Sequence, residues 1–196
     1  MRKGICVPMI TLCLLLCSCG GKGEERVQDL RTAYREMTGA DCEAVVTASQ
    51  ENLVWQGRLR WEYTPQETTF TVLEPEHIAG VRGILKGEEL SLEYEDLCLD
   101  AGAISREELS PAVCVPRLIG ALRDGWLLEE NEENWAGEPC VRMTLDQSGQ
   151  ETKILSTVWL RADGTPLRGE ISVDGEIILT AEFTNFTFCD NIGQER

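Results

Sequence analysis

The sequence predicts a mainly β protein, built from one large antiparallel sheet and two helices. Three observations predict this fold class. Apolar and polar residues alternate along most segments after residue 41, turn sequences rich in Gly, Asp and Pro separate these segments, and only two stretches carry apolar residues at helical spacing. We therefore expect roughly nine or ten strands.

The two helices are expected near the N-terminus and in the middle of the chain. Over residues 24–37 the apolar residues recur every three or four positions, which places them on one helix face: Val27, Leu30, Tyr34 and Met37. The second helix is expected over residues 111–124, because Ser110-Pro111 offers a start and Gly125 follows the last turn.

The strands follow from alternation with a period of two. Residues 53–63 are the clearest case, since their large apolar side chains share one face with Gly57: Leu53, Trp55, Leu59, Trp61 and Tyr63. The same alternation predicts strands around Phe70 and Val72, over residues 90–94 and over residues 141–145. Residues Glu129–Asn134 are interpreted as a solvated connection within a hairpin.

Two hairpins are expected in the C-terminal part. Residues 153–161 and 167–173 are joined through the turn sequence 162–166, and Asp174-Gly175 leads into a last strand from residue 177. The apolar positions of this strand change parity after Phe183. A β-bulge near Thr184 or Asn185 would explain the change, and the alternative is that the strand ends there.

Two helices are too few to cover one face of so large a sheet. The sheet must therefore curl, and it either fills its inside with its own side chains or keeps a cavity there. The residues alone leave both options open.

Residues 1–18 have the pattern of a bacterial lipoprotein signal peptide. Arg2 and Lys3 precede an apolar run of about 12 residues, which is shorter than the roughly 20 that cross a bilayer. The run ends at Leu16-Cys17-Ser18-Cys19, which resembles the lipobox, whose cysteine accepts a diacylglyceryl group. We expect cleavage before Cys19, a lipidated tether over residues 19–25 and a folded domain over residues 26–196. The protein would then be extracytoplasmic and anchored to the cell membrane through Cys19.

Charge and composition exclude several functions. The net charge of −16 disfavours contact with nucleic acid. The single histidine, His77, lies in an expected turn and lacks the partners of a catalytic site, so we expect no enzyme. The acidic run Glu88, Glu89, Glu93, Glu95, Asp96 and Asp100 lacks the spacing of a calcium loop and is interpreted as a wet strand face, and we expect no metal and no cofactor beyond the lipid on Cys19.

Five cysteines remain in the expected domain: Cys42, Cys98, Cys114, Cys140 and Cys189. No Cys-x-x-Cys motif occurs among them, so a zinc or thioredoxin-like motif is not indicated. Two pairs could oxidise in an exported protein, or all five could stay reduced as small apolar residues.

Residues 41–188 resemble the LolA-type lipoprotein carriers and the related membrane-anchored germination lipoproteins of spore-forming bacteria. The resemblance lies in the order of elements and in the stretches Gly57–Tyr63, Phe70–Gly80, Leu118–Gly125 and Thr180–Phe188. It implies an incomplete antiparallel barrel, with helices as a lid over an apolar cavity that in some members holds acyl chains. The family's arginine that pins the lid has no assigned match here, because Arg58 and Arg60 lie at polar positions of their strand.

The resemblance suggests which residues could line such a cavity, although residues of this kind usually pack a core. They lie on the apolar faces of the expected strands: Trp55, Leu59, Trp61, Phe70, Val72, Leu90 and Leu92. Two functions are therefore expected. The first is a membrane-anchored interaction module that supports an envelope or spore-cortex enzyme, and the alternative is a protein that binds an acyl chain or a lipoprotein on its concave face.

Overall fold

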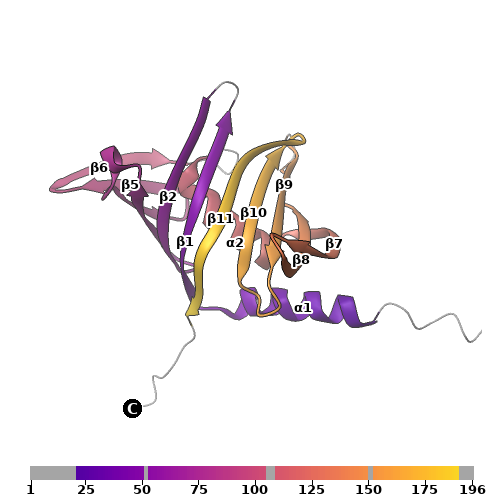
Figure 1. Ribbon diagram of the computed structural model, residues 1–196. Coiled ribbons are helices and arrows are strands. Elements are labelled where there is room, and N and C mark those ends of the chain that lie inside the picture. Colours follow the sequence, from indigo (N-terminus) through magenta and orange to yellow (C-terminus); the bar gives the residue numbers. More distant parts are fainter. Residues whose placement is uncertain (1–20, 51–52, 105–108, 150–151, 190–196) are drawn as a thin grey trace, which may run out of the picture.

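The computed structural model describes residues 21–50, 53–104, 109–149 and 152–189, and a single sheet of eleven strands dominates them (Figure 1). The strands are β1 (Gly39–Gln50), β2 (Leu53–Tyr63), β3 (Thr68–Glu74), β4 (Arg82–Lys86), β5 (Glu89–Tyr94), β6 (Leu97–Ala103), β7 (Trp126–Trp135), β8 (Glu138–Asp146), β9 (Ile154–Leu160), β10 (Pro166–Val173) and β11 (Glu176–Cys189). The helical elements are α1 (Gly21–Glu36), α2 (Cys114–Asp124) and the short 3-10 helices η1 (Glu76–Ile78) and η2 (Pro111–Val113).

The sheet is antiparallel throughout and does not close. Its order is β6-β5-β4-β3-β2-β1-β11-β10-β9-β8-β7, so the first and last strands of the chain meet in the middle and β6 and β7 form the two edges. The sheet curves so that its two sides face each other across a gap (Figure 1). We call β4–β6 the β6 limb and β7–β9 the β7 limb. This confirms the expected fold class: a mainly β protein whose curved antiparallel sheet does not close, with two helices. The short helix was expected as a lid, and it packs instead against the inside of the sheet.

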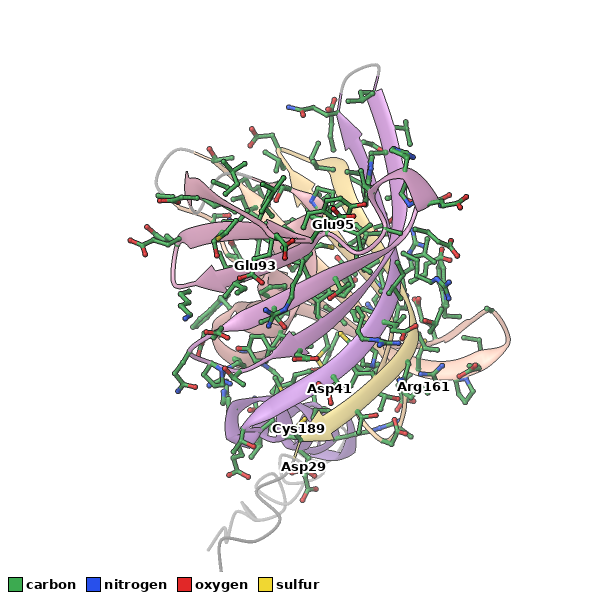
Figure 2. The ribbon with its side chains drawn as sticks, turned by 90° about the vertical axis from the view of Figure 1, so that its left-hand side faces the viewer. Asp29, Asp41, Glu93, Glu95, Arg161 and Cys189 are labelled. Atoms are coloured by element: carbon green, nitrogen blue, oxygen red, sulfur yellow. The ribbon has the colours of Figure 1, made fainter. Side chains whose placement is uncertain are left out.

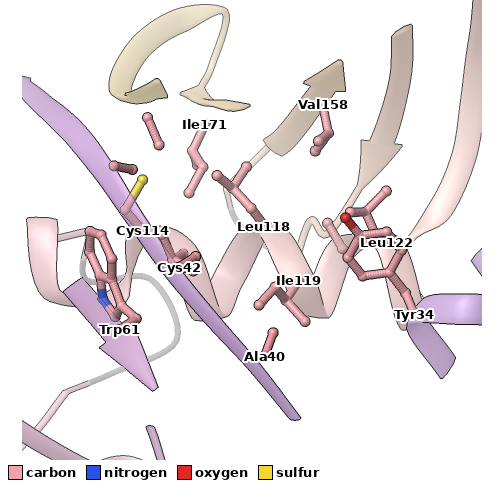
Figure 3. Close-up of a cluster of buried hydrophobic side chains, with 14 of the residues drawn as sticks. Tyr34, Ala40, Cys42, Trp61, Cys114, Leu118, Ile119, Leu122, Val158 and Ile171 are labelled. Carbon is pink, nitrogen blue, oxygen red and sulfur yellow. The ribbon is translucent and has the colours of Figure 1, made fainter. Parts of the chain in front are cut away.

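Helix α2 fills the concave face of the sheet. It lies in the connection between the two edge strands, and this connection has to cross from one limb to the other. Six of its residues are at most 2% exposed: Cys114, Val115, Leu118, Ile119, Ala121 and Leu122. Figure 3 shows three of them, Leu118, Ile119 and Leu122, pointing among side chains of the surrounding strands. The inside of the sheet beneath α2 is therefore a packed core.

Glycine in β10 allows this close packing. A Cβ atom at Gly169 would lie 2.3 Å from Cδ1 of Leu118, which is far inside van der Waals contact. Phe70 and Trp55 lie in the same way over Gly83 and Gly57, where a Cβ atom would be 2.1 and 2.4 Å from their rings. Large side chains thus lie flat on the sheet where it carries no side chain of its own.

Helix α1 closes one end of the curved sheet. Its predicted apolar stripe is buried, and the Tyr34 hydroxyl donates a hydrogen bond to the Gly164 carbonyl in the β9–β10 turn at 2.8 Å. The Tyr34 ring also packs edge-on against Phe188, with 5.3 Å between the ring centroids. The helix begins at Gly21, so residues 21–25 of the expected tether are helical. Cys19 and the expected signal peptide lie outside the described residues.

Most of the expected strand and turn features are present. The β10–β11 turn has positive φ at Asp174 (51°) and Gly175 (91°), the conformation that an Asp-Gly hairpin turn favours. The register of β1 on β11 shifts between Asn185 and Phe183, which leaves Thr184 as the extra residue of a bulge. The expected bulge is confirmed.

The interpretation of Glu129–Asn134 as a hairpin connection is wrong. These residues form the middle of β7, which pairs with β8. β7 is an edge strand, and charged side chains are a common protection of such edges against unwanted pairing. No strand was expected at β4 or β6 either, and the sheet has eleven strands where roughly nine or ten were expected. In the described part of the chain no helix is long and apolar enough to span a membrane.

The contact between Leu118 and Gly169 predicts the effect of adding one methyl group. We expect Gly169→Ala to lower the free energy of unfolding by about 1–3 kcal/mol, because Leu118 is buried and has no space into which it can turn. Urea unfolding followed by tryptophan fluorescence measures the change.

Gly120→Ala is the matched control. A Cβ atom at Gly120 meets no atom closer than 3.8 Å, and alanine favours a helix over glycine by roughly 1 kcal/mol. The control should therefore be neutral or stabilising. Equal stability of Gly169→Ala and the wild type would contradict the packing described above.

Candidate functional site

An open groove of about 830 Å³ lies between the two limbs, on the side of α2 that faces away from the sheet. The β6 limb contributes Leu85, Gly87, Glu88 and Ile104, the β7 limb contributes Asp146, Gln147, Ser148, Gly149 and Ile154, and the chain between the limbs contributes Val113, Pro116, Arg117, Gly120, Asp124 and Gly125. The groove thus occupies the gap left by the unclosed sheet.

The floor of the groove follows from the helical repeat of α2. Pro116, Arg117, Gly120 and Asp124 are spaced by one, three and four residues, so they lie on one face of the helix. The opposite face carries the residues that are buried against the sheet. Gly120 in the middle of the floor has no side chain, which leaves the groove open at that point.

Hydrogen bonds hold the β8–β9 connection against α2. The Gln147 side chain donates from Nε2 to the Arg117 carbonyl at 3.2 Å, and the Ser156 hydroxyl donates to Oε1 of Gln147 at 2.7 Å. The backbone N–H of Ser148 donates to Asp146 Oδ1 at 2.7 Å. Hydrogen bonds from Ser148 lower the pKa of Asp146 from its ordinary value, so this carboxylate is ionised at neutral pH.

The groove combines apolar surface with an excess of negative charge. Its apolar side chains are Leu85, Ile104, Val113, Pro116 and Ile154. Its charged side chains are the three carboxylates of Glu88, Asp124 and Asp146 and the guanidinium of Arg117. Such a lining suits a ligand with apolar parts and positive charge better than an anionic one.

The described lining of the groove is a surface of mixed apolar and polar side chains. Among these described lining residues there is neither a histidine nor a cysteine, and His77 lies elsewhere, in the helix η1. Among the described residues, no group of three or more His, Cys, Asp and Glu side chains is placed to hold a metal ion.

The seven residues expected at a cavity come together on the concave face, but none of them lines this groove. Leu59, Trp61, Phe70, Val72 and Leu90 are buried in the core cluster, and Trp55 and Leu92 pack against it. Trp61 also donates from Nε1 to the Ala112 carbonyl at 3.4 Å, next to α2. Their role as the lining of a lipid cavity stays a prediction.

Two arginines of α1 hold the end of α2, and the sequence did not single them out. Arg31 donates from Nε to the Leu122 carbonyl at 3.0 Å and from Nη2 to the Gly125 carbonyl at 2.5 Å, and Arg35 donates to the Arg123 carbonyl at 2.8 Å. The last carbonyls of a helix lack partners within it, and positive charge beside them is stabilising. Arg31 is only 6% exposed. The sequence did not indicate this burial, because charged residues of an amphipathic helix are expected on its solvent face.

Arg58 and Arg60, which the sequence left without a match to the family's lid-pinning arginine, form ion pairs on the sheet instead. Arg58 pairs with Glu74 at 2.7 Å, and Arg60 pairs with Glu43 on the neighbouring strand. Both arginines are substantially exposed, so these ion pairs contribute little to stability.

Within the described part of the chain, no disulfide joins the five cysteines, which are Cys42, Cys98, Cys114, Cys140 and Cys189. Burial raises the pKa of Cys42 and of Cys114 to about 12. An unfolded chain has cysteine pKa values near 8.5, so between roughly pH 8.5 and 12 the unfolded state loses these protons and the folded state keeps them. The two thiols therefore stabilise the fold fully below that range, and this contribution is lost as the pH rises through it.

The comparisons with known proteins find similarity at the level of the fold. No family model matches the chain, and no curated protein matches its sequence. A LolA superfamily protein from Nitrosomonas europaea aligns over 86% of this chain and 94% of its own, with 10% identity and a TM-score of 0.44. The lipoprotein LppX from Mycobacterium tuberculosis aligns over 86% and 97%, with 17% identity and a TM-score of 0.48. A chain of the MucA–MucB complex from Pseudomonas aeruginosa aligns over 88% and 59%, with 14% identity and a TM-score of 0.44.

Removing the charge of Arg31 should weaken the fold. We expect Arg31→Met to lower the free energy of unfolding by about 2–3 kcal/mol, because it leaves the Leu122 and Gly125 carbonyls without their charged donor. Arg26→Met is the control on the same helix, since Arg26 makes only an exposed ion pair with Glu132 at 3.0 Å and should cost less than about 1 kcal/mol. If both variants lowered the free energy of unfolding by a similar amount in urea, Arg31 would not be the residue that holds the end of α2.

The thiols should differ in reactivity in the folded protein. At pH 8 we expect iodoacetamide to label the exposed Cys98 readily and to leave Cys42 and Cys114 unlabelled until urea unfolds the chain, because a pKa near 12 leaves almost no thiolate. Peptide mass spectrometry locates the label. Labelling of Cys114 at the rate of Cys98 under native conditions would contradict its burial.

Proposed function

We propose that this chain is an extracytoplasmic lipoprotein, anchored to the cell membrane through Cys19, that acts as a non-catalytic interaction module for an envelope protein. The observation that carries the proposal is the groove between the limbs, which two sides of an open sheet and one face of α2 build together. Its volume of about 830 Å³ and its mixture of apolar and polar groups are typical of binding sites.

The charge of the groove favours a protein segment over a fatty acid or an anionic lipid. Glu88, Asp124 and Asp146 outnumber Arg117, and the whole chain carries a net charge of −16. A carboxylate or phosphate ligand would meet repulsion at the groove and across the surface. A protein segment with basic and apolar side chains meets neither.

The anchor and the partner class are the finer parts of the proposal. The lipobox-like sequence before Cys19 supports attachment to the membrane through a diacylglyceryl group. The resemblance of the sequence to germination lipoproteins supports a partner among envelope enzymes, such as one that acts on the spore cortex. The module would hold that enzyme at the membrane surface.

The alternative is an acyl chain or the lipid of another lipoprotein in the same groove. It is favoured by the five apolar side chains of the lining, of which Leu85, Ile104 and Ile154 come from the two walls. An acyl chain would lie between these walls, outside α2.

Filling the groove should abolish partner binding. In Gly120→Trp the indole occupies the open floor of the groove, so we expect a protein that co-purifies stoichiometrically with the full-length chain from native membranes to be lost. Quantitative mass spectrometry of the captured proteins, with lipid extraction of the same samples, gives the measurement.

Gly120→Ala is the control, because it changes the same position and leaves the groove open. It should retain the partner as the wild type does. A lipid of defined mass that is lost only in Gly120→Trp would favour the acyl-chain alternative. A partner captured equally by all three chains would overturn the role of the groove.

A further inference from the structure

Strand β6 is an exposed sheet edge with apolar side chains. It pairs with β5 on one side, and no described strand pairs with its other side. All seven of its residues are exposed, and the exposed fractions of Leu97 and Leu99 are 74% and 63%. The unpaired backbone groups of such an edge are a template for an incoming strand.

The opposite edge of the sheet is protected, whereas β6 is not. β7 carries four glutamates, and one of them, Glu132, forms an ion pair with Arg26 of α1 at 3.0 Å. Charged side chains on an edge discourage pairing with another strand. β6 carries a single charged residue, Asp100, near its middle.

Carboxylates surround the β6 edge in excess over cations. The two cations of the nearby β4 are already engaged, Arg82 with Glu93 at 3.1 Å and Lys86 with Glu67 at 2.9 Å. The remaining carboxylates on β5, on β6 and in the turn between them form no ion pair within the described residues: Glu89, Glu95, Asp96 and Asp100. Figure 2 faces this side of the molecule and shows Glu93 and Glu95 on it.

We infer that β6 binds an extended partner segment that alternates apolar and basic residues, by adding it to the sheet as a further strand. The regular pairing of β6 runs over Leu97–Asp100, before a bulge at Ala101, so these residues are the template. The apolar side chains of the segment pack on Leu97 and Leu99, and its basic side chains meet the surrounding carboxylates.

The edge leads directly into the groove. Ile104 follows β6, its N–H donates to the Glu88 carbonyl at 2.7 Å, and both residues line the groove. The inference therefore rests on the proposed function, because a single partner segment would occupy the groove and continue along β6.

A second copy of this chain is a poor occupant of the edge. Pairing β6 with β6 would bring Asp96 and Asp100 of one copy near those of the other, and pairing β6 with β7 would bring them near the glutamates of β7. Like charges placed opposite one another across a pair of strands are destabilising.

A synthetic peptide tests the strand addition. The probe is a fluorescent peptide of about eight alternating lysine and valine residues, and its binding to the full-length chain in neutral detergent micelles is followed by anisotropy. We expect a peptide with the same sequence and charge but alternate backbone N-methyl groups to bind at least about tenfold more weakly, since it cannot form the ladder of hydrogen bonds. A glutamate–valine peptide should not bind. Equal binding of the methylated and unmethylated peptides would overturn the inference, because charge alone would explain it.

A matched pair of variants locates the site. Leu99→Lys places a cation on the edge and should weaken the lysine–valine peptide about tenfold, while its exposure leaves the fold unchanged in thermal unfolding. Ile177→Lys makes the same change at a 49% exposed residue of β11, away from the edge, and should bind as the wild type does. Equal weakening by both variants would overturn the assignment to β6.

The outcomes separate this inference from the proposed function. If Gly120→Trp loses the captured partner but Leu99→Lys does not weaken the peptide, the groove stands and strand addition at β6 falls. If the peptide behaves as expected while capture does not depend on Gly120, β6 stands as a strand-binding edge and the groove loses its role.

Discussion

The packing of α2 against the concave face is the interaction on which the rest of the structure depends. A curved sheet whose edges do not meet leaves an apolar face that its own strands cannot cover, and α2 covers it with six buried side chains. Because α2 lies in the connection between β6 and β7, it also occupies the gap between the limbs. The same helix thus completes the core with one face and forms the floor of the groove with the other. The stability of the fold and the proposed binding site therefore depend on the same element.

The use of charge follows from this arrangement. Arg31 and Arg35 donate their hydrogen bonds to carbonyls at the end of α2. Arg168 forms ion pairs with Glu170 and Glu182, and its guanidinium lies 4.8 Å from the centroid of the Trp135 ring. Much of the scarce positive charge is therefore committed to internal or cross-strand contacts. Carboxylates remain in the groove and around β6, so both of these surfaces are acidic. This excess is what gives both proposed surfaces the same preference for basic ligands.

The sequence predicted the parts of the fold in which one side of an element is buried. Leu59 and Trp61 alternate with charged residues because the core takes one face of β2, and the parity change at Thr184 was visible for the same reason. β6 and β7 bury neither face fully, so their sequences do not alternate between apolar and polar residues.

The groove could not be predicted from the sequence, because it is built by turns and one helix face, from residues spread between Leu85 and Ile154. The large residues expected at a cavity lie on the concave side, but the alternation of the strands does not show that they pack into the core cluster.

The central pairing of β1 with β11 has a consequence for how the chain folds. β1–β6 and β7–β11 are each joined by consecutive hairpins or short connections, and such local pairings form quickly. Gly39 opposite Cys189 joins residues about 150 positions apart, so this contact carries a large cost in loop-closure entropy. Two partly ordered halves would form first, and the seam between them would close last, once the final strand is available. A chain that lacks its last strand would keep the long central β1 as an open edge, which makes the completeness of β11 a condition for solubility while the chain folds.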